Sequence, residues 1–554
     1  MVFSSVNVAT MFLQTTTSIQ NDKKYLCHRL VQSYREGKKV KHKTIVTLSK
    51  CSPAEIEAIR FALKHKNNLA SLATVNDIDA KIGMRIGAVL ILNHIAERIG
   101  LHKALGNSRD GRLALWQVLA RLIDQGSRLS AVRLAQSHSA CDLLGLDSFN
   151  EDHLYENLAW LSEHQQEIEL KLFKSRYKND KPQLFLYDVT SSYLEGTKNA
   201  LGAFGYNRDK KKGKMQLVVG LLTAPDGNPV AVRVFEGNTN DTKTVEEQIY
   251  IVAKIFNIDE VTFVGDKGML KKVQIEQIKN NRFHYITSIT KAEITTLIRK
   301  NVFQYELFDE TLCDVLHDGI RYVFRRNHVR AEQIKKTRED KMSKIKSIID
   351  AKNTYLSEHT KAKTEVAQKN ITKFIEKFNL KKLLKVEVEE RVLSVTVDEI
   401  LIKCDSRLDG CYVIKTDLPK EKATKEEIHS RYKDLAKVER AFRTFKSGHL
   451  EIRPAFVRTE KSTRGHVFVV MLAYLLESEL DQCWKDFNIT VAEGIDELGT
   501  IRGVEFEYNG GICQKIPAAT GTVKRLLEAV GVTLPEALPL RKVNVATRKN
   551  IARS

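Results

Sequence analysis

The amino-acid sequence predicts an α/β protein of several domains: a basic β-hairpin, an all-α domain, and a mixed-sheet core interrupted by an inserted α+β domain. Three observations support this. The chain has 554 residues, more than one hydrophobic core usually serves. Its apolar pattern is helical over 83–180, and from residue 183 onward short apolar strands alternate with helices. An apolar content of 42% is typical of folded globular chains.

The charge of the chain favours a polyanionic partner. Lys and Arg number 89 against 69 acids, a net charge of +20. Nucleic acid is the commonest such partner, and a solvated basic surface or a ribosome-adjacent protein is the alternative. The eight cysteines include no CxxC pair, so neither a zinc ribbon nor a thioredoxin-like site is expected. The apolar runs at 86–96 and 467–476 are too short to span a bilayer, and no export signal is evident, so we expect a cytoplasmic protein.

Residues 1–82 are predicted to form a basic hairpin followed by a helix. Tyr25–Tyr34 and Val40–Leu48 alternate in polarity, and the intervening residues 35–38 make a turn. The first 50 residues hold nine Lys or Arg and two acids, which suits a DNA-backbone contact or an ordinary exposed face. Ser52 and Pro53 have the character of a helix N-cap and first helical position.

Residues 83–180 are predicted to be all-α. Leu113, Trp116 and Leu119 recur at helical spacing, as do Leu154, Leu158 and Leu161. DNA-end recognition and simple packing are both compatible with such a domain.

The mixed-sheet core is predicted over 181–289 and 421–485. Three strands are expected at Gln183–Tyr187, Gln216–Leu222 and Pro229–Phe235, followed by a helix over Thr242–Phe256. Strand Val261–Gly265, helix Lys271–Lys279 and strand Phe283–Ser288 complete the run. This is the order of the ribonuclease-H-like α/β core.

The rest of the chain flanks or interrupts this core. Residues 290–420, with lysine-rich helices and then a β-rich part, are predicted to be an inserted domain. A helix from about Lys425 to Phe445 and an apolar helix His466–Leu480 resume the core. Residues 486–554 form a C-terminal region whose basic tail, Arg541–Arg553, is a second DNA-contact candidate or a plain tail.

Two aspartates follow apolar strands of the predicted sheet. Asp188 ends Leu-Phe-Leu-Tyr-Asp, and Asp266 ends Val-Thr-Phe-Val-Gly-Asp. One such carboxylate is usually a turn or helix cap. Because adjacent strands lie about 4.8 Å apart, two carboxylates at the ends of neighbouring strands can share a cation. Mg²⁺ prefers a few carboxylates with water and phosphate oxygens.

A third carboxylate, Glu439, lies on the predicted helix that resumes the core. Tyr432, Glu439 and Lys446 are seven residues apart, so one helix would project them along one stripe. A metal ligand flanked by phosphate contacts would use such a row. A solvated face with i,i+3 and i,i+4 ion pairs is the alternative.

This row resembles the Tyr-x2-Arg-x3-Glu-x6-Lys signature of a large group of insertion-sequence DDE transposases, the insertion sequence 4 superfamily. Further stretches resemble the same group, and the N-terminal hairpin with Ser33-Tyr34-Arg35 resembles its insertion sequence 1634 branch. These stretches are Gly205-Tyr206-Asn207-Arg208-Asp209, Glu236-Gly237-Asn238-Thr239 and Arg464-Gly465-His466-Val467-Phe468. One position departs, because the Arg of the signature falls at Leu435. Lys433, Arg431 and Arg443 are the neighbours that could replace it.

The resemblance implies a bacterial, nucleoid-associated enzyme that cuts DNA at the ends of its element and joins them to target DNA. It implies Asp188, Asp266 and Glu439 as catalytic residues and metal ligands for two Mg²⁺ ions per active site, with Mn²⁺ as a substitute. Tyr432, Lys446, Arg443 and Lys433 would contact DNA. The implied partners are double-stranded DNA, as terminal inverted repeats and target, and a second copy in a homodimer.

Two other functions fit the same residues. A ribonuclease-H-like nuclease would cut without joining. A transposase-derived DNA-binding protein would be catalytically silent, and Leu435 is the residue that favours it.

Overall fold

A computed structural model describes residues 10–20, 23–36, 39–65, 79–446, 450–453, 457–508, 511–539, 541, 543 and 545–548. The chain separates into two compact units. The first comprises Met1–Arg85, Ile501–Ala519 and Leu534–Leu538, and the second comprises Ile86–Thr500, Thr520–Thr533 and Pro539–Ser554.

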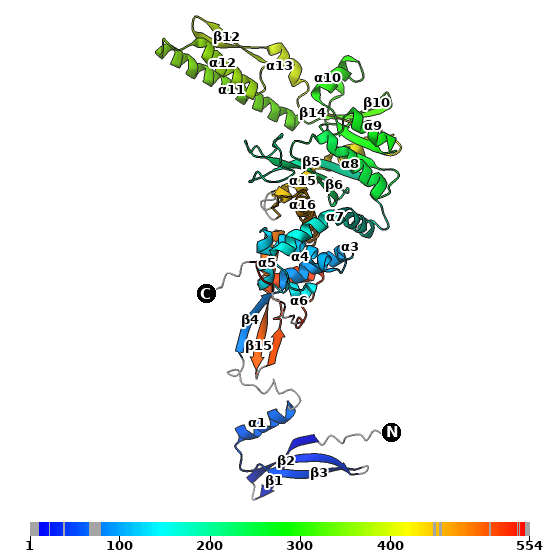
Figure 1. Ribbon diagram of the computed structural model, residues 1–554, viewed down its shortest axis with the longest axis vertical. Helices are drawn as coiled ribbons and strands as arrows, with labels where there is room; N and C mark the ends of the chain where they lie inside the picture. The colour runs from blue at the N-terminus through cyan, green and yellow to red at the C-terminus, as the bar shows by residue number, and fades with distance from the viewer. Residues whose placement is uncertain are drawn as a thin grey trace. The chain divides into compact units, whose positions relative to one another are not determined.

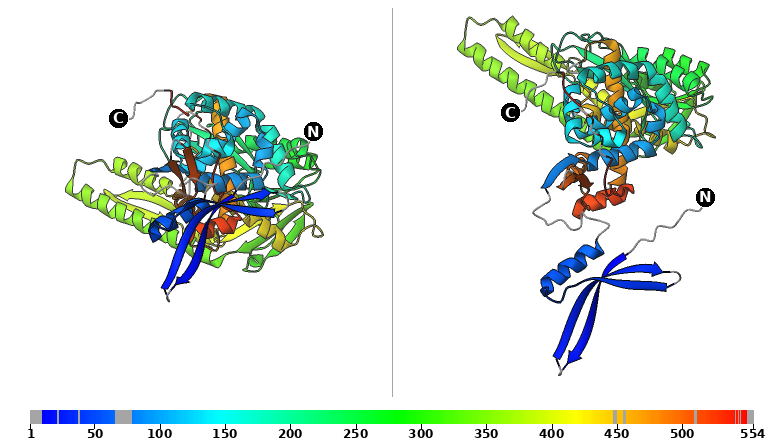
Figure 2. Two further views of the ribbon diagram at one scale, coloured as in Figure 1. Left: turned by 90° about the horizontal axis from the view of Figure 1, so that it is seen from below. Right: turned by 60° about the horizontal axis from the view of Figure 1, so that its bottom comes forward.

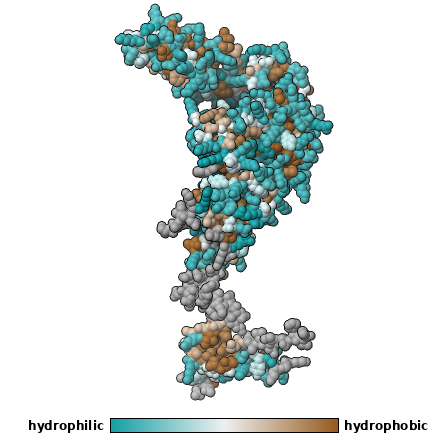
Figure 3. All heavy atoms as spheres, viewed as in Figure 1, coloured by the Kyte–Doolittle hydropathy of each residue, from teal (hydrophilic) through white to brown (hydrophobic). Residues whose placement is uncertain are grey.

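The first unit contains an antiparallel sheet of β1 (Thr10–Gln20), β2 (Lys23–Glu36) and β3 (Lys39–Thr47), followed by α1 (Pro53–Lys64). The predicted strand pair corresponds to β2 and β3, and β1 is an additional strand paired along β2. Gly37 and Lys38 of the predicted turn lie outside the described residues. The predicted start of α1 is confirmed, because Ser52 and Glu55 form a reciprocal capping box. Apolar side chains gather on part of this unit's surface (Figure 3).

A second sheet in this unit joins residues from opposite ends of the sequence. Its strands are β4 (Asp79–Arg85), β15 (Arg502–Tyr508) and β16 (Gly511–Lys515), and Ala80 pairs with Phe506. This sheet was not predicted from the sequence. Pairing partners so distant in the chain leave no turn signal between them, and β4 was assigned partly to the N-terminal segment and partly to the helical domain.

The second unit begins with the predicted helices, from Gly87 rather than Gly83. Helix α16 (Glu460–Cys483) is buried over most of its length and packs against α4, α7 and the strand β7 (Figures 1 and 2). The predicted apolar helix His466–Leu480 is therefore present. The other helices of this part are α2 (Gly87–Arg98), α3 (Leu101–Leu105), α4 (Arg109–Ile123), α5 (Arg128–Ser137), α6 (Ala140–Leu144), α7 (Glu151–Arg176), α17 (Val491–Leu498) and α18 (Gly521–Val530).

An eight-stranded mixed sheet forms the centre of the second unit, in the order β10-β11-β14-β9-β8-β5-β6-β7 (Figure 1). β5, β8 and β9 are parallel to one another, and the remaining pairs are antiparallel. The strands are β5 (Leu184–Tyr193), β6 (Gln216–Thr223), β7 (Pro229–Glu236), β8 (Thr262–Gly265), β9 (His284–Ser288), β10 (Cys313–His317), β11 (Ile320–Arg326) and β14 (Cys411–Thr416). The first five match the predicted strands.

Helices cover the sheet and bury its aromatic residues. Phe185, Tyr187 and Phe263 belong to one core cluster with residues of α8 (Val245–Tyr250) and α9 (Lys272–Asn280). The helix predicted over Thr242–Phe256 is composite: a 3-10 turn over Asp241–Thr244 precedes α8, and a π-helical turn over Ile251–Ile255 follows it.

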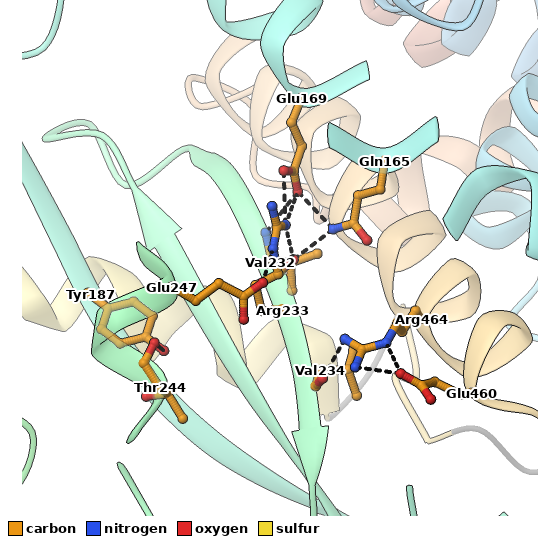
Figure 4. Close-up of polar contacts among 10 residues, drawn as sticks. All are labelled: Gln165, Glu169, Tyr187, Val232, Arg233, Val234, Thr244, Glu247, Glu460 and Arg464. Carbon is orange, nitrogen blue, oxygen red and sulfur yellow. Dashed lines mark hydrogen bonds and ion pairs between the residues drawn. The ribbon is translucent and has the colours of Figure 1, made fainter. Parts of the chain in front are cut away.

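Side chains of α7 and α16 cover the free edge of β7 (Figure 4). Gln165 donates to the carbonyl of Val232 at 2.7 Å, and Arg464 donates to the carbonyl of Val234 at 2.7 Å. The buried carboxylate of Glu169 accepts from the backbone N–H of Val232 and forms an ion pair with Arg233 at 2.8 Å. These bonds satisfy an edge that would otherwise expose unpaired backbone groups.

Residues 290–420, predicted as one inserted domain, are divided in the structure. β10, β11 and β14 extend the main sheet, because β14 pairs with β9 through Ile414 and Ser288. The intervening elements form a module with its own core, coloured yellow-green in Figure 2. They are α11 (His328–Glu358), α12 (Thr364–Lys377), β12 (Leu384–Glu389), β13 (Val392–Val397) and α13 (Glu399–Ser406); α10 (Lys291–Arg299) precedes β10. Part of the segment predicted to be β-rich, Glu399–Ser406, is instead the helix α13, which precedes β14.

No helix in the described ranges is long and apolar enough to cross a membrane.

The buried helix α16 carries a carboxyl group that makes stability depend on pH. Burial, and then the charge of Asp481, raise the pKa of Glu477 from 4.5 to about 7. The stability that this group contributes is therefore complete below its unfolded pKa and is lost as the pH rises through about 7. We expect Glu477→Gln to raise the free energy of unfolding by up to about 3 kcal/mol at pH 8.5, with little change at pH 4.5.

Denaturant unfolding at the two pH values measures this difference. Glu479→Gln is the control, because Glu479 lies on the same helix and is ion-paired with Arg98. A Glu477→Gln effect that is equal at both pH values would contradict the assignment.

Candidate active site

The parallel pairing of β5 and β8 brings Asp188 and Asp266 together. Tyr187 of β5 pairs with Gly265 of β8, and each aspartate is the next residue after its member of this pair. Asp188 is not at a strand end as predicted, because β5 continues to Tyr193 along β6. The parallel pairing does end just before it, which leaves the carboxylates side by side at the carboxyl ends of this pairing.

Glu439 reaches the same place from a helix. It lies on α15 (Leu435–Lys446), which packs against β5 through a buried face that includes Val438, Phe442 and Phe445. Asp188, Asp266 and Glu439 line one cavity of about 420 Å³. All three also line a second cavity of about 510 Å³, so they lie where the two cavities meet.

The helix predicted from Lys425 to Phe445 is interrupted. The structure has α14 (Lys425–Lys433) and α15, with Asp434 between them. The backbone N–H of Lys437 bonds to the carbonyl of Asp434 rather than to that of Lys433, which tightens the chain there. Tyr432 therefore lies on α14, whereas Glu439 and Lys446 lie on α15. Tyr432 still lines the first cavity, and Lys446 lines the second.

Negative charge accumulates at Asp188. Partial burial, with a smaller contribution from Asp266 and Glu439, raises the pKa of Asp188 to about 6. The backbone N–H of Val189, 2.8 Å from Asp188 Oδ1, and the charge of Arg208 act in the opposite direction. The region therefore favours a cation.

The donor set fits a divalent cation. Within the part of the chain that is described, none of the three carboxylates forms an ion pair with Lys, Arg or His. In the same residues no group of three or more His, Cys, Asp or Glu side chains is close enough to hold one ion together. A hard cation such as Mg²⁺ does not require such a cage, because it is usually held by one or two carboxylates plus water and phosphate oxygens.

The four predicted DNA-contact residues lie around these acids. Tyr432 and Lys433 line the first cavity, and Arg443 and Lys446 line the second. The hydroxyl of Tyr432 donates to Ser288 Oγ at 2.8 Å, and burial raises the pKa of this phenol.

Two ion pairs hold the loop between β5 and β6 near the second cavity. Lys446 Nζ lies 2.8 Å from Asp209 Oδ1. Arg208 is ion-paired with Asp241 at 2.6 Å, and both residues line this cavity. The Lys446 ammonium predicted to contact DNA therefore already has a protein partner.

Sequence reasoning missed Arg325. This residue of β11 lines the first cavity together with Leu435, the position where the signature has Arg. Its Nε is buried and has no hydrogen-bond partner among the described residues. The residue was assigned to the inserted domain, and only the pairing of β11 with β14 brings it to the site. The run Arg325-Arg326-Asn327 gave no local signal of this.

Comparison with known proteins identifies the family of this chain. Residues 179–476, more than half of the chain, match the family described as the transposase DDE domain. Residues 13–74 match the N-terminal domain of the IS1634 family transposases.

Among solved structures, the chain is similar to the piggyBac transposase in a cryo-EM synaptic complex with hairpin DNA. The TM-score is 0.35 at 8% sequence identity, covering 74% of this chain and 76% of that chain. A likeness this low has no bearing on the fold. No curated protein matches the chain.

The resemblance predicted from the sequence is thus confirmed for the catalytic segment and for the N-terminal domain. The family cuts and joins DNA, and its DDE domain implies the use of divalent metal ions. The chain belongs to the DDE transposases, in their IS1634 family.

Proposed function

We propose that Asp188, Asp266 and Glu439 are the catalytic carboxylates of this transposase and hold two Mg²⁺ ions, for which Mn²⁺ can substitute. The observation that carries the proposal is the convergence of these three acids, from two parallel strands and a helix, on one cavity. Asp188 would hold an ion together with Asp266 and Glu439, because all three acids line both cavities and Asp188 is the least exposed of them.

The topology supports a ribonuclease-H-like assignment for this part of the chain. β7, β6, β5, β8 and β9 lie in that order, with β6 and β7 antiparallel and β8 and β9 parallel to β5. This is the arrangement expected from three hairpin-connected strands followed by two strand–helix crossovers. The module of α11–α13 with β12 and β13 is then an insertion between β11 and β14.

When bound, the ions activate water and stabilise charge on the attacking and leaving oxygens of a phosphodiester. The protein side chains hold and orient the substrate. Tyr432, anchored to Ser288, and Lys433 border one side of the acids, while Arg443 and Lys446 border the other. Contacts of this kind position the DNA backbone without reading its bases.

We further propose that Arg325 supplies the cation that the signature places at position 435. It borders the same cavity as Leu435 and Glu439, and its Nε is left without a partner among the described residues. A guanidinium is well suited to a phosphate because its donors form a fork. This substitution argues against a catalytically silent protein, for which Leu435 was the main support.

The substrates under this proposal are double-stranded DNA at the terminal inverted repeats of the element and at the target. A homodimer belongs to the proposal because two ends must be held together for joining. The net charge of +20 supports the DNA partner.

Removing the charge of each carboxylate tests the metal site. Asp188→Asn, Asp266→Asn and Glu439→Gln each remove a ligand charge, so we expect DNA cleavage and strand transfer to fall on the order of a thousandfold or more. Binding of end DNA should be retained. Nicking and joining assays with Mg²⁺ and labelled element ends measure both steps.

Asp481→Asn is the matched control, since Asp481 is an exposed acid on α16 that is ion-paired with Arg440. Near-normal cleavage by any of the three variants would remove that residue from the metal site. Cleavage without joining by the wild type would favour the nuclease alternative.

Substitution of Arg325 and of its neighbour Arg326 tests whether the Arg325 guanidinium contacts phosphate. Arg325→Ala should lower the cleavage rate about tenfold or more, because a charge-assisted bond to phosphate is lost. Arg326→Ala is the control, because Arg326 bonds to the carbonyl of Asp409 and lines neither cavity. Equal cleavage rates for the two variants in single-turnover assays would count against Arg325.

Substitution of Lys446 tests whether its ammonium contacts DNA. If this ammonium exchanges Asp209 for a DNA phosphate, Lys446→Ala should reduce the salt dependence of DNA binding by about 0.9 in the log–log slope. Lys437→Ala is the control, because Lys437 is bonded to Asp434 and to the carbonyl of Pro225. An unchanged slope for Lys446→Ala in a salt titration would leave Lys446 with a purely structural ion pair.

A further inference from the structure

A small cavity away from the three acids is lined by positive charge. It measures about 150 Å³ and lies between α4, α5, α7 and the segment that leads into α16. Its lining includes two almost fully buried arginines, Arg121 and Arg128, each 4% exposed. Gln125, at the same cavity, is exposed, so solvent reaches its rim.

Among the described residues, the two guanidiniums donate hydrogen bonds to neutral acceptors. Arg121 donates from Nη1 to the carbonyl of Gln125 at 2.6 Å, and Arg128 donates to the amide oxygen of Gln117. The Nε of Arg121 is buried and has no partner among the described residues. No acidic side chain in the described ranges forms an ion pair with either arginine, and the undescribed neighbours at 447–449 and 454–456 contain no acid.

Acidic side chains around the cavity offset only part of this charge: the charges of Asp124 and Glu451 act on Arg121. Glu451 lines it but is bonded to Arg453, whose Nε lies 2.5 Å from the Glu451 carboxylate. His466 is buried beside the arginines, and burial together with their charge lowers the pKa of this imidazole well below its usual value, so it is neutral. The lining therefore has a net positive charge.

Burial of unpaired charge is costly unless a counter-ion binds. Burial lowers the pKa of Arg121 to about 10 and that of Arg128 to about 9, so both remain cationic at neutral pH. By contrast, two other buried arginines of this unit form ion pairs: Arg233 with Glu169, and Arg321 with Asp314. Arg121 and Arg128 thus differ from the structural ion pairs of the same unit.

The cavity also suits an anion in size and in its backbone. Its volume of about 150 Å³ is well above what a single water molecule needs. Gly126, Ser127 and Arg128 line it at the N-terminus of α5, where backbone N–H groups lack intrahelical acceptors and the helix dipole is positive.

We propose that this cavity is a binding site for a phosphate group, held by Arg121 and Arg128. The group is either a backbone phosphate of bound DNA or a free phosphate anion. Forked guanidinium donors match the oxygens of either one. The site is independent of the catalytic assignment above, because it can be tested without metal or cleavage.

Titration of the full-length protein with inorganic phosphate, in EDTA and at constant ionic strength, tests the site. We expect saturable binding of one phosphate per chain by calorimetry. Arg121→Met and Arg128→Met should each weaken it about tenfold or more, since each removes charge-assisted bonds. Lys171→Met is the charge-matched control, because Lys171 is an exposed residue of α7 already paired with Glu167.

Duplex DNA binding distinguishes the two sources of phosphate. If DNA supplies the group, Arg121→Met reduces the log–log salt slope by about 0.9 and inorganic phosphate competes with DNA. If the anion is free, phosphate binds with one-to-one stoichiometry while the slope stays unchanged.

Arg121→Lys and Arg128→Lys keep the charge and serve if the Met variants do not fold; each should bind phosphate more weakly than the wild type but measurably. The proposal is overturned if the folded wild type shows neither saturable phosphate binding nor a salt slope steeper than that of the variants.

Discussion

The parallel register of β5 and β8 is the constraint on which the site depends. Pairing of Tyr187 with Gly265 sets Asp188 and Asp266 at equivalent positions in two adjacent segments of the sheet. A slip of one residue would turn one carboxylate to the opposite face of the sheet, because side chains alternate along a strand. The aromatic core beneath, with Phe185 and Phe263, resists such a slip since it would have to expose these rings.

Buried charge in the second unit falls into two classes. Glu169 with Arg233, and Arg321 with Asp314, are paired charges that fasten one element to another. The buried guanidiniums of Arg121 and Arg128 form no ion pair among the described residues, and neither does the partly buried carboxylate of Asp188. Since unpaired charge opposes folding, its presence in two cavities indicates ligands: cations at the first and an anion at the second.

Under the proposed role of Arg325, the linear motif loses its arginine at Leu435 while the site keeps a cation. A cation beside Glu439 is present in space, but it is Arg325, more than one hundred residues earlier in the chain. The strand pairing of β11 with β14 and of β14 with β9 carries this residue to the cavity. A guanidinium acts through the position of its donors, so the element that supplies it is secondary.

The sequence alone determined the features that depend on local periodicity and turn chemistry. The five central strands, the long helices, the cap at Ser52 and the three acidic residues follow from short-range patterns. Only the tertiary structure decided which distant segments pair: β4 with β15, and β14 with β9. The physical reason is that strand pairing and charge compensation depend on partners remote in the chain, which leave no signature in either partner's own sequence.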